Sequence, residues 1–150
     1  MKPLVVLLTV FVISLFATKL FHGSADFSWS GKVAMAAMLL FTAIAHFVFT
    51  KGMTMMLPPF FSYKTEIIYL TGIIEIAAAI GLFVPDFKEL TAWLLITFFI
   101  LILPANIFAA IHQIDYQKGT PGGNGLAYLW FRIPLQLFLI LWVYLSVLKN

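Results

Sequence analysis

The stretch LWFRIPLQLFLILWVY, residues 129–144, is almost wholly apolar yet holds Arg132 and Gln136 one helical turn apart. An apolar run of this kind predicts a membrane-spanning helix, for which about 20 residues are needed. A charged side chain inside such a helix costs about 2.5–3.5 kcal/mol on insertion scales, so it normally faces other helices or a cavity. The stretch therefore predicts a membrane fold with a polar interior.

The composition of the whole chain agrees with this prediction. Of its 150 residues, 63% are hydrophobic and 10% are charged, whereas soluble domains average about 45–50% apolar and about 25% charged residues. The charged residues lie singly, with a net charge of +3, so no basic run indicates a nucleic-acid partner. Because there is no cysteine, disulfides and Cys-ligated metal clusters are excluded, and we predict no metal site. We expect a single all-α transmembrane domain over residues 1–150.

Five segments are long and apolar enough to cross a bilayer as helices, namely residues 3–21, 33–50, 66–84, 90–112 and 126–148. The first also has features of a signal peptide, with GSA (23–25) as a cleavage site, but its apolar stretch continues to a spanning length, so we expect a retained helix. The connection over residues 51–66 contains a Pro–Pro pair among Met and Phe residues, which predicts a segment along the membrane interface. The Gly-rich connection over residues 113–125 predicts a flexible linker.

Five spans would divide the lysines equally between the two membrane surfaces. One side, here called side A, would carry Lys2, Lys51, Lys64 and Lys118. The opposite side would carry Lys19, Lys32, Lys88 and Lys149. Equal numbers give the positive-inside rule no preference, so the orientation of side A is not predicted.

Polar residues inside the predicted spans form a candidate site. With a rise of 1.5 Å per residue, Arg132 and Asn106 lie about 9 Å from side A, His46 about 6 Å and Glu75 about 13 Å. Four different helices thus bring polar groups to the same half of the membrane, and we predict that Glu75 is the counter-charge of Arg132. Helical spacing places Tyr128 and Gln136 on the face of Arg132. The candidate ligand-binding residues are His46, Glu75, Asn106, Tyr128, Arg132 and Gln136.

Two interpretations of this polar set remain open at the level of sequence. A buried Glu75–Arg132 pair can fix helix register without any chemistry, or it can line a ligand or proton site, as intramembrane ionisable residues usually do. His46 alone fits a packed core histidine as well as a ligand contact. A haem held by His46 and His112 is less favoured, and so is a Cu(I) site at the methionines of residues 53–56, because flexible apolar filler accounts for methionines at an interface.

Four stretches of the chain resemble the DoxX-like family of small bacterial membrane proteins. They are AHFVFTKGMTMMLPPF (45–60), YLTGIIEIAAAIGLFVPDFKELTAWLL (69–95), PANIFAA (104–110) and FRIPLQLFLILWVY (131–144). The resemblance runs from about Ala34 to the C-terminal end and implies a multi-pass protein of the bacterial inner membrane. It also implies a four-helix core, to which segment 3–21 is added. The positions that match the family pattern are His46, Pro58, Glu75, Asn106, Arg132 and Gln136.

The family takes its name from a subunit of a thiosulfate:quinone oxidoreductase. The resemblance therefore implies a membrane subunit of an oxidoreductase system, with a redox partner protein, that binds a quinone-like or other small amphipathic ligand. In this interpretation His46 and Arg132 bind a carbonyl or anionic head, while Glu75 balances charge or relays a proton. Whether the chain is itself an enzyme and whether it forms a homo-oligomer stay open. The alternative is a non-enzymatic scaffold or small transporter subunit whose polar network is structural.

Overall fold

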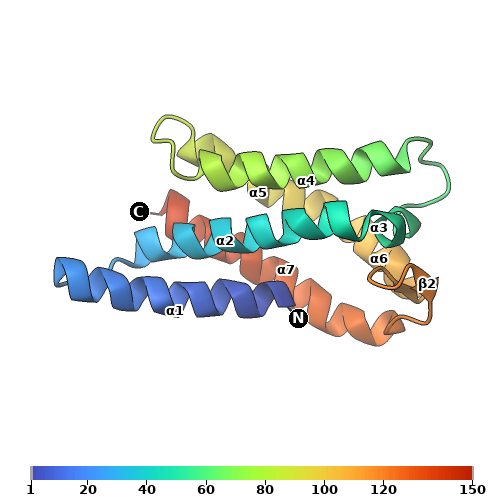
Figure 1. Cartoon of the computed structure of the whole chain (residues 1–150), viewed down its shortest axis with the longest axis horizontal. Coiled ribbons are helices and arrows are strands. Elements are labelled where there is room, and N and C mark those ends of the chain that lie inside the picture. Colours follow the sequence, from blue (N-terminus) through green and yellow to red (C-terminus); the bar gives the residue numbers. More distant parts are fainter. Residues whose placement is uncertain (1, 150) are drawn as a thin grey trace.

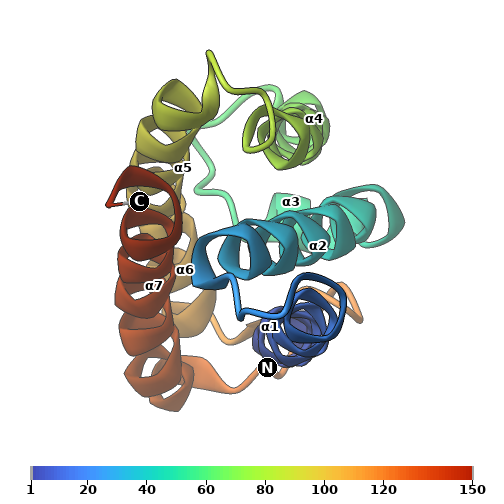
Figure 2. The ribbon, with the colours of Figure 1, turned by 90° about the vertical axis from the view of Figure 1, so that its left-hand side faces the viewer.

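The computed structural model describes residues 2–149, which form two layers of helices that run roughly along one axis (Figure 1). One layer contains α1 (Lys2–His22), α2 (Phe27–Val48) and α4 (Lys64–Gly81). The other contains α5 (Lys88–Leu101), α6 (Leu103–Ile111) and α7 (Leu129–Val143). The view along the axis shows α2 in the centre of its layer, between α1 and α4 and facing α7 (Figure 2). The all-α prediction is confirmed.

Four helical stretches of the described chain are long and apolar enough to cross a membrane. They are Lys2–His22, Phe27–Val48, Lys88–Ile111 and Gly125–Leu148. The fifth predicted span corresponds to α4, whose 18 residues include Lys64, Glu66 and Glu75. This charge content exceeds that of the other four stretches, so length and composition identify four candidate spans and leave a crossing by α4 a prediction.

Local chemistry explains where several helices begin and break. The carboxylate of Asp26 accepts a hydrogen bond from the backbone N–H of Trp29 at 2.8 Å, so α2 begins at Phe27 rather than at residue 33. Pro104 has no N–H group to continue the preceding helix, and the predicted span 90–112 is divided at Ile102 into α5 and α6. Pro134, by contrast, lies within an unbroken α7.

The connections contain more structure than the sequence indicates. Residues 50–55 form the short helix α3 (Thr50–Met55). The predicted flexible linker at 113–125 is wrong, because it contains an antiparallel hairpin of β1 (Ile114–Asp115) and β2 (Thr120–Pro121), followed by the 3₁₀ helix η1 (Gly125–Tyr128). The hairpin packs on α3 where Gly52 meets the carbonyl group of Tyr116, a contact that leaves no room for a side chain. At the C-terminal end, α7 continues into the π-helical turn η2 (Tyr144–Leu148).

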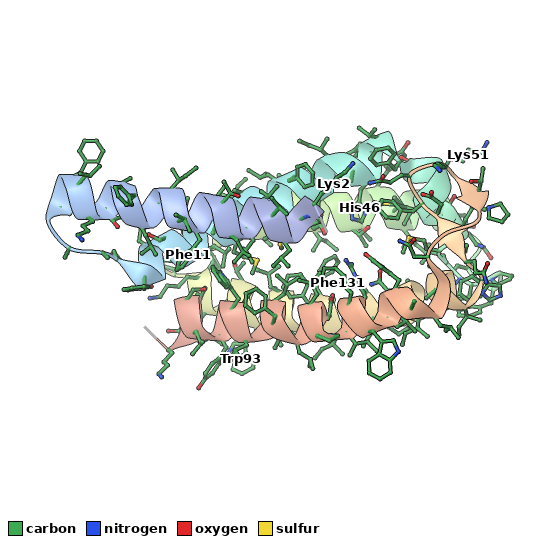
Figure 3. All side chains as sticks on the ribbon, turned by 90° about the horizontal axis from the view of Figure 1, so that it is seen from below. Lys2, Phe11, His46, Lys51, Trp93 and Phe131 are labelled. Atoms are coloured by element: carbon green, nitrogen blue, oxygen red, sulfur yellow. The ribbon has the colours of Figure 1, made fainter. Side chains whose placement is uncertain are left out.

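Helix α1 is shifted along the axis relative to the other helices. Its first turn lies near the middle of the long axis, whereas α2, α4 and α7 extend further toward the end that carries α3 and the hairpin (Figure 1). A hydrogen bond of 3.1 Å from Ser14 Oγ to Ser30 Oγ fixes this register. Lys2 is therefore not beside Lys51 at the side A end, as the sequence predicted, but about halfway along the bundle (Figure 3).

Candidate functional site

A cavity of about 40 Å³ lies between the two helical layers. Its polar walls are the side chains of Thr42 on α2, Glu75 on α4, and Arg132 and Gln136 on α7. Apolar side chains from α2, α5 and α7 complete it, and residues 3–4 at the start of α1 form the remaining wall. We call this cavity and its polar walls the chamber. Five helices contribute to it, so the chamber exists only in the assembled bundle.

Three buried polar atoms on the chamber residues have no hydrogen-bond partner within residues 2–149. They are Glu75 Oε2, Arg132 Nε and Gln136 Oε1. Leaving one such atom without a partner costs roughly 1–3 kcal/mol, so three around one cavity form an unusual concentration. The cavity volume of about 40 Å³ exceeds the roughly 10–15 Å³ that a single water molecule requires. The chamber is therefore large enough to receive a small polar group that satisfies these atoms.

Glu75 is paired with His46 rather than with Arg132. The distance from His46 Nε2 to Glu75 Oε1 is 3.6 Å, and the two side chains are 15% and 7% exposed. The predicted direct ion pair between Glu75 and Arg132 is wrong, since no salt bridge in the described chain involves Arg132. Glu75 and Arg132 both line the chamber but form no ion pair, so the guanidinium has no carboxylate partner in the described chain.

The close approach of α4 to α2 explains this choice of partner. Gly72 lies one turn before Glu75, and a Cβ atom at Gly72 would be 3.0 Å from the Cβ of His46. Small residues at helix contacts allow this separation, as they generally do in membrane proteins. On its other edge, His46 Nδ1 lies 2.9 Å from Thr71 Oγ1 and 3.2 Å from the carbonyl oxygen of Ile68. The imidazole is thus held by α4 on both sides.

Gln136 joins the two helices of its own layer inside the chamber. Its Nε2 donates a hydrogen bond of 2.6 Å to the backbone carbonyl of Phe99 on α5, and both groups are buried. Phe99 lies shortly before the break at Ile102. The amide is therefore fixed in orientation, with Oε1 left without a partner.

The structure brings together His46, Glu75, Arg132 and Gln136, but not the other two candidates. Asn106 is buried, yet its Nδ2 donates to the carbonyl of Ile102 in its own helix at 2.9 Å, and the residue lies outside the chamber wall. Tyr128 lies in η1, with its ring 6.1 Å from that of Phe131, and it also lies outside the wall. Neither side chain lines the chamber, so a part for them in ligand binding stays a prediction.

Sequence reasoning missed other residues of the site. Thr42 lies one turn before His46 on α2, and Thr71 lies one turn before Glu75 on α4, so helical spacing carried a signal for both. The hydroxyl of Thr42 donates within its own helix, toward the carbonyls of Met38 and Leu39. No signal pointed to residues 3–4, because their part in the wall depends on the axial shift of α1.

Comparison with known families places most of the chain in one domain. Residues 35–147 match a family model described as "Domain of unknown function (DUF8561)". The chain belongs to this family. The matched residues include all the polar side chains of the chamber and also His46, whereas α1 lies outside them. No curated protein and no solved structure matches the chain, and the likeness to the DoxX-like family stays a prediction.

The arrangement combines two chemical capacities. An imidazole in contact with a buried carboxylate can accept and donate protons. A guanidinium group without an acid partner can bind a carbonyl or anionic oxygen. The carboxylate of Glu75 and the guanidinium of Arg132 each have an atom without a partner in the described chain, and both residues line the same small cavity.

Proposed function

We propose that the protein is a five-span protein of the bacterial inner membrane whose chamber binds the polar head of a small amphipathic ligand of the quinone class. One observation carries the binding proposal, namely the three unpartnered polar atoms of Glu75, Arg132 and Gln136 around a single cavity. A network that served only to hold helices together would pair its own members, since native proteins rarely leave buried polar groups unsatisfied. The likeness to the DoxX-like family supports the assignment to an oxidoreductase system with a redox partner protein.

The unpartnered atoms indicate the chemistry of the head group. Arg132 Nε is a donor, whereas Glu75 Oε2 and Gln136 Oε1 are acceptors when the carboxylate is ionised. A hydroxyl group accepts from the first and donates to one of the others, and a carbonyl group accepts from the first alone. A quinol has hydroxyl groups and a quinone has carbonyl groups, so both redox forms fit the chamber, and the quinol satisfies more of its atoms.

The volume of the chamber limits how much of the ligand it holds. A drug-sized ligand requires about 300–1,000 Å³, and the chamber provides about 40 Å³. We therefore place one oxygen of the head in the chamber and the ring and tail outside it, on the side of α1. This helix is the least buried of the four apolar stretches, with 11% of its most apolar 18 residues buried against 33–39% for the others.

The variant Arg132→Met separates a ligand-binding role from a structural one. Because Arg132 has no ion-pair partner in the described chain, its replacement by an apolar side chain of similar length should leave the melting temperature in detergent unchanged or raise it. Binding of a short-tailed ubiquinol, measured by titration calorimetry on the purified protein, should weaken at least tenfold. Lys118→Met, in the exposed hairpin, is the control and should bind as the wild type does.

Two results would contradict the proposal. The first is a wild-type protein that carries no quinone when extracted gently from its membrane, by mass spectrometry, and binds none in the titration. The second is an Arg132→Met variant that binds the quinol normally but melts several degrees lower, which is the behaviour of a scaffold or transporter subunit with a purely structural network. Breaking a true buried ion pair costs about 3–5 kcal/mol, so the two roles differ clearly in this measurement.

A further inference from the structure

The hydrogen bonds around His46 determine which ring nitrogen carries hydrogen. Thr71 Oγ1 donates its own hydrogen to the carbonyl of Ile68 at 2.8 Å, and a hydroxyl group has only one hydrogen to give. Toward His46 Nδ1, at 2.9 Å, the same oxygen can therefore only accept. The carbonyl of Ile68, at 3.2 Å from Nδ1, is likewise an acceptor. Both neighbours require a hydrogen on Nδ1.

This tautomer has a consequence on the opposite edge of the ring. In a neutral imidazole with hydrogen on Nδ1, Nε2 is an acceptor, and it faces Glu75 Oε1 at 3.6 Å. An ionised carboxylate is also only an acceptor, so the two atoms repel one another unless a proton lies on one of them. One proton held between the two atoms removes this repulsion and leaves the pair without net charge, so that Arg132 is then the uncompensated charge of the chamber.

We propose that the His46–Glu75 pair is a one-proton exchange site that takes the hydroxyl proton of the ligand and releases a proton at His46. This inference rests on the proposed function, since it assigns the fate of the ligand's proton. The ligand O–H bond breaks, its proton passes to Glu75 Oε2, and the oxygen keeps the electron pair and lies against Arg132. The Nε2–H bond of the imidazolium then breaks, its proton passes to solvent water, and the pair again holds one proton.

The surroundings of the pair fit this direction of transfer. The side chain of Glu75 is less exposed than that of His46. Glu75 lines the chamber, and its Oε2 has no hydrogen-bond partner among the described residues. Arg132, across the cavity on α7, is the other charged residue of the wall. The charge of Arg132 favours the loss of a proton from the pair once the ligand is bound.

The first test concerns the tautomer and needs no ligand. The chain has three histidines, so ¹⁵N spectra of histidine-labelled protein in lipid nanodiscs are simple, and His46→Gln identifies the signals of His46. We expect the neutral ring of His46 to carry its hydrogen on Nδ1, with Nε2 bare. Hydrogen on Nε2 and a bare Nδ1 in the neutral ring would overturn the inference.

The second test counts protons. Calorimetric titration with the short-tailed ubiquinol, in two buffers of different ionisation enthalpy at one pH, gives the number of protons released per ligand bound. We expect about one for the wild type and a clear decrease for His46→Gln. The control is His112→Gln, because this exposed histidine bonds to the carbonyl of Phe108 and packs on the ring of Phe108, outside the chamber wall, and it should behave as the wild type does.

The outcomes separate this inference from the function on which it rests. Quinol binding without proton release in the wild type overturns the exchange site and leaves the binding proposal intact. An absence of quinol binding overturns the proposed function, and the inference with it. Proton release that is unchanged in His46→Gln assigns the proton to another group and also overturns the inference.

Discussion

Gln136 is the residue that couples α7 to α5 inside the chamber. Its side-chain amide donates to the carbonyl of Phe99 at 2.6 Å, and within a membrane no bulk water is available to replace this bond. We expect Gln136→Leu to lower the stability of the bundle by about 1 kcal/mol, the usual size of such interhelical bonds. Thermal unfolding in detergent measures the change, with the exposed Gln117→Leu as the control. Equal melting temperatures for the two variants would contradict a stabilising role for this bond.

At the scale of single residues, the sequence predicted which helices contribute polar groups better than it predicted their partners. Helical spacing placed His46, Glu75 and Arg132 on inward faces, and the structure places them there. Spacing along a helix does not give the distance between helices, however. Gly72 brings α4 so close to α2 that Glu75 meets His46, and the pairing with Arg132 could not be distinguished from this one in advance.

Asn106 illustrates a second limit at the same scale. Its depth in the membrane agreed with that of the other polar residues, but its amide donates to the carbonyl of Ile102, at the break between α5 and α6. The carbonyl of Ile102 also accepts the backbone N–H of Asn106 at 3.2 Å, so the side-chain amide shares an acceptor one turn back in its own helix. Depth in the membrane does not distinguish a side chain that bonds within its own helix from one that faces the chamber.

At the scale of elements, apolar runs predicted the helices because a buried backbone in lipid must satisfy its own hydrogen bonds. Connections follow other rules, which the composition of residues 113–125 did not reveal. Asp115 accepts hydrogen bonds from the backbone N–H groups of Gln117 and Lys118, and Gly119 and Gly122 adopt positive φ angles of 64° and 112°. These local interactions turn a segment with the composition of a linker into a hairpin.

The contact between α2 and η2 offers a test of how closely two elements must pack. A Cβ atom at Gly31 would lie 2.6 Å from the Cβ of Ser146, so Gly31→Ala should force the two elements apart. We expect a loss of about 1–3 kcal/mol, as for other overpacked sites, seen as a lower melting temperature in detergent.

A compensating variant makes this prediction specific. The double variant Gly31→Ala/Ser146→Gly removes the obstructing Cβ and should recover part of the lost stability, although Ser146→Gly alone weakens its helix by about 1 kcal/mol. A double-mutant cycle measures the coupling between the two positions. If the two losses simply add, the contact does not limit the packing of α2 on η2.

At the scale of the whole molecule, α4 decides how many times the chain crosses the membrane. Its 18 residues correspond to about 27 Å of helix, close to the roughly 30 Å of a hydrocarbon core. Lys64 and Glu66 lie in its first turn, where they can reach the interface, and Glu75 is buried against α2. The charges that separate α4 from the other spans are therefore either at its end or enclosed by protein.

Exposed aromatic side chains at the two ends of the bundle agree with a crossing by α4. Tyr63 precedes α4 and Trp130 lies in the first turn of α7, both at the side A end, while Trp29 lies in the first turn of α2, toward the opposite end. Trp and Tyr favour both membrane–water interfaces. Side A and the opposite end thus have the surface chemistry expected where a protein leaves the bilayer.

The absence of cysteine from the chain makes the topology directly measurable, because a single introduced thiol is the only target for a maleimide. If α4 crosses the membrane, Lys51→Cys before it and Asp86→Cys after it should react with a membrane-impermeant maleimide from opposite sides of sealed vesicles. Lys118→Cys should react from the side of Lys51→Cys, and Ser24→Cys from that of Asp86→Cys. Labelling of Lys51→Cys and Asp86→Cys from one side would instead mean that α4 lies within the bundle without crossing. In that case the chamber would still be enclosed by the same helices, but Glu75 and Arg132 would lie at a different depth, and a ligand from the lipid phase would approach them along another path.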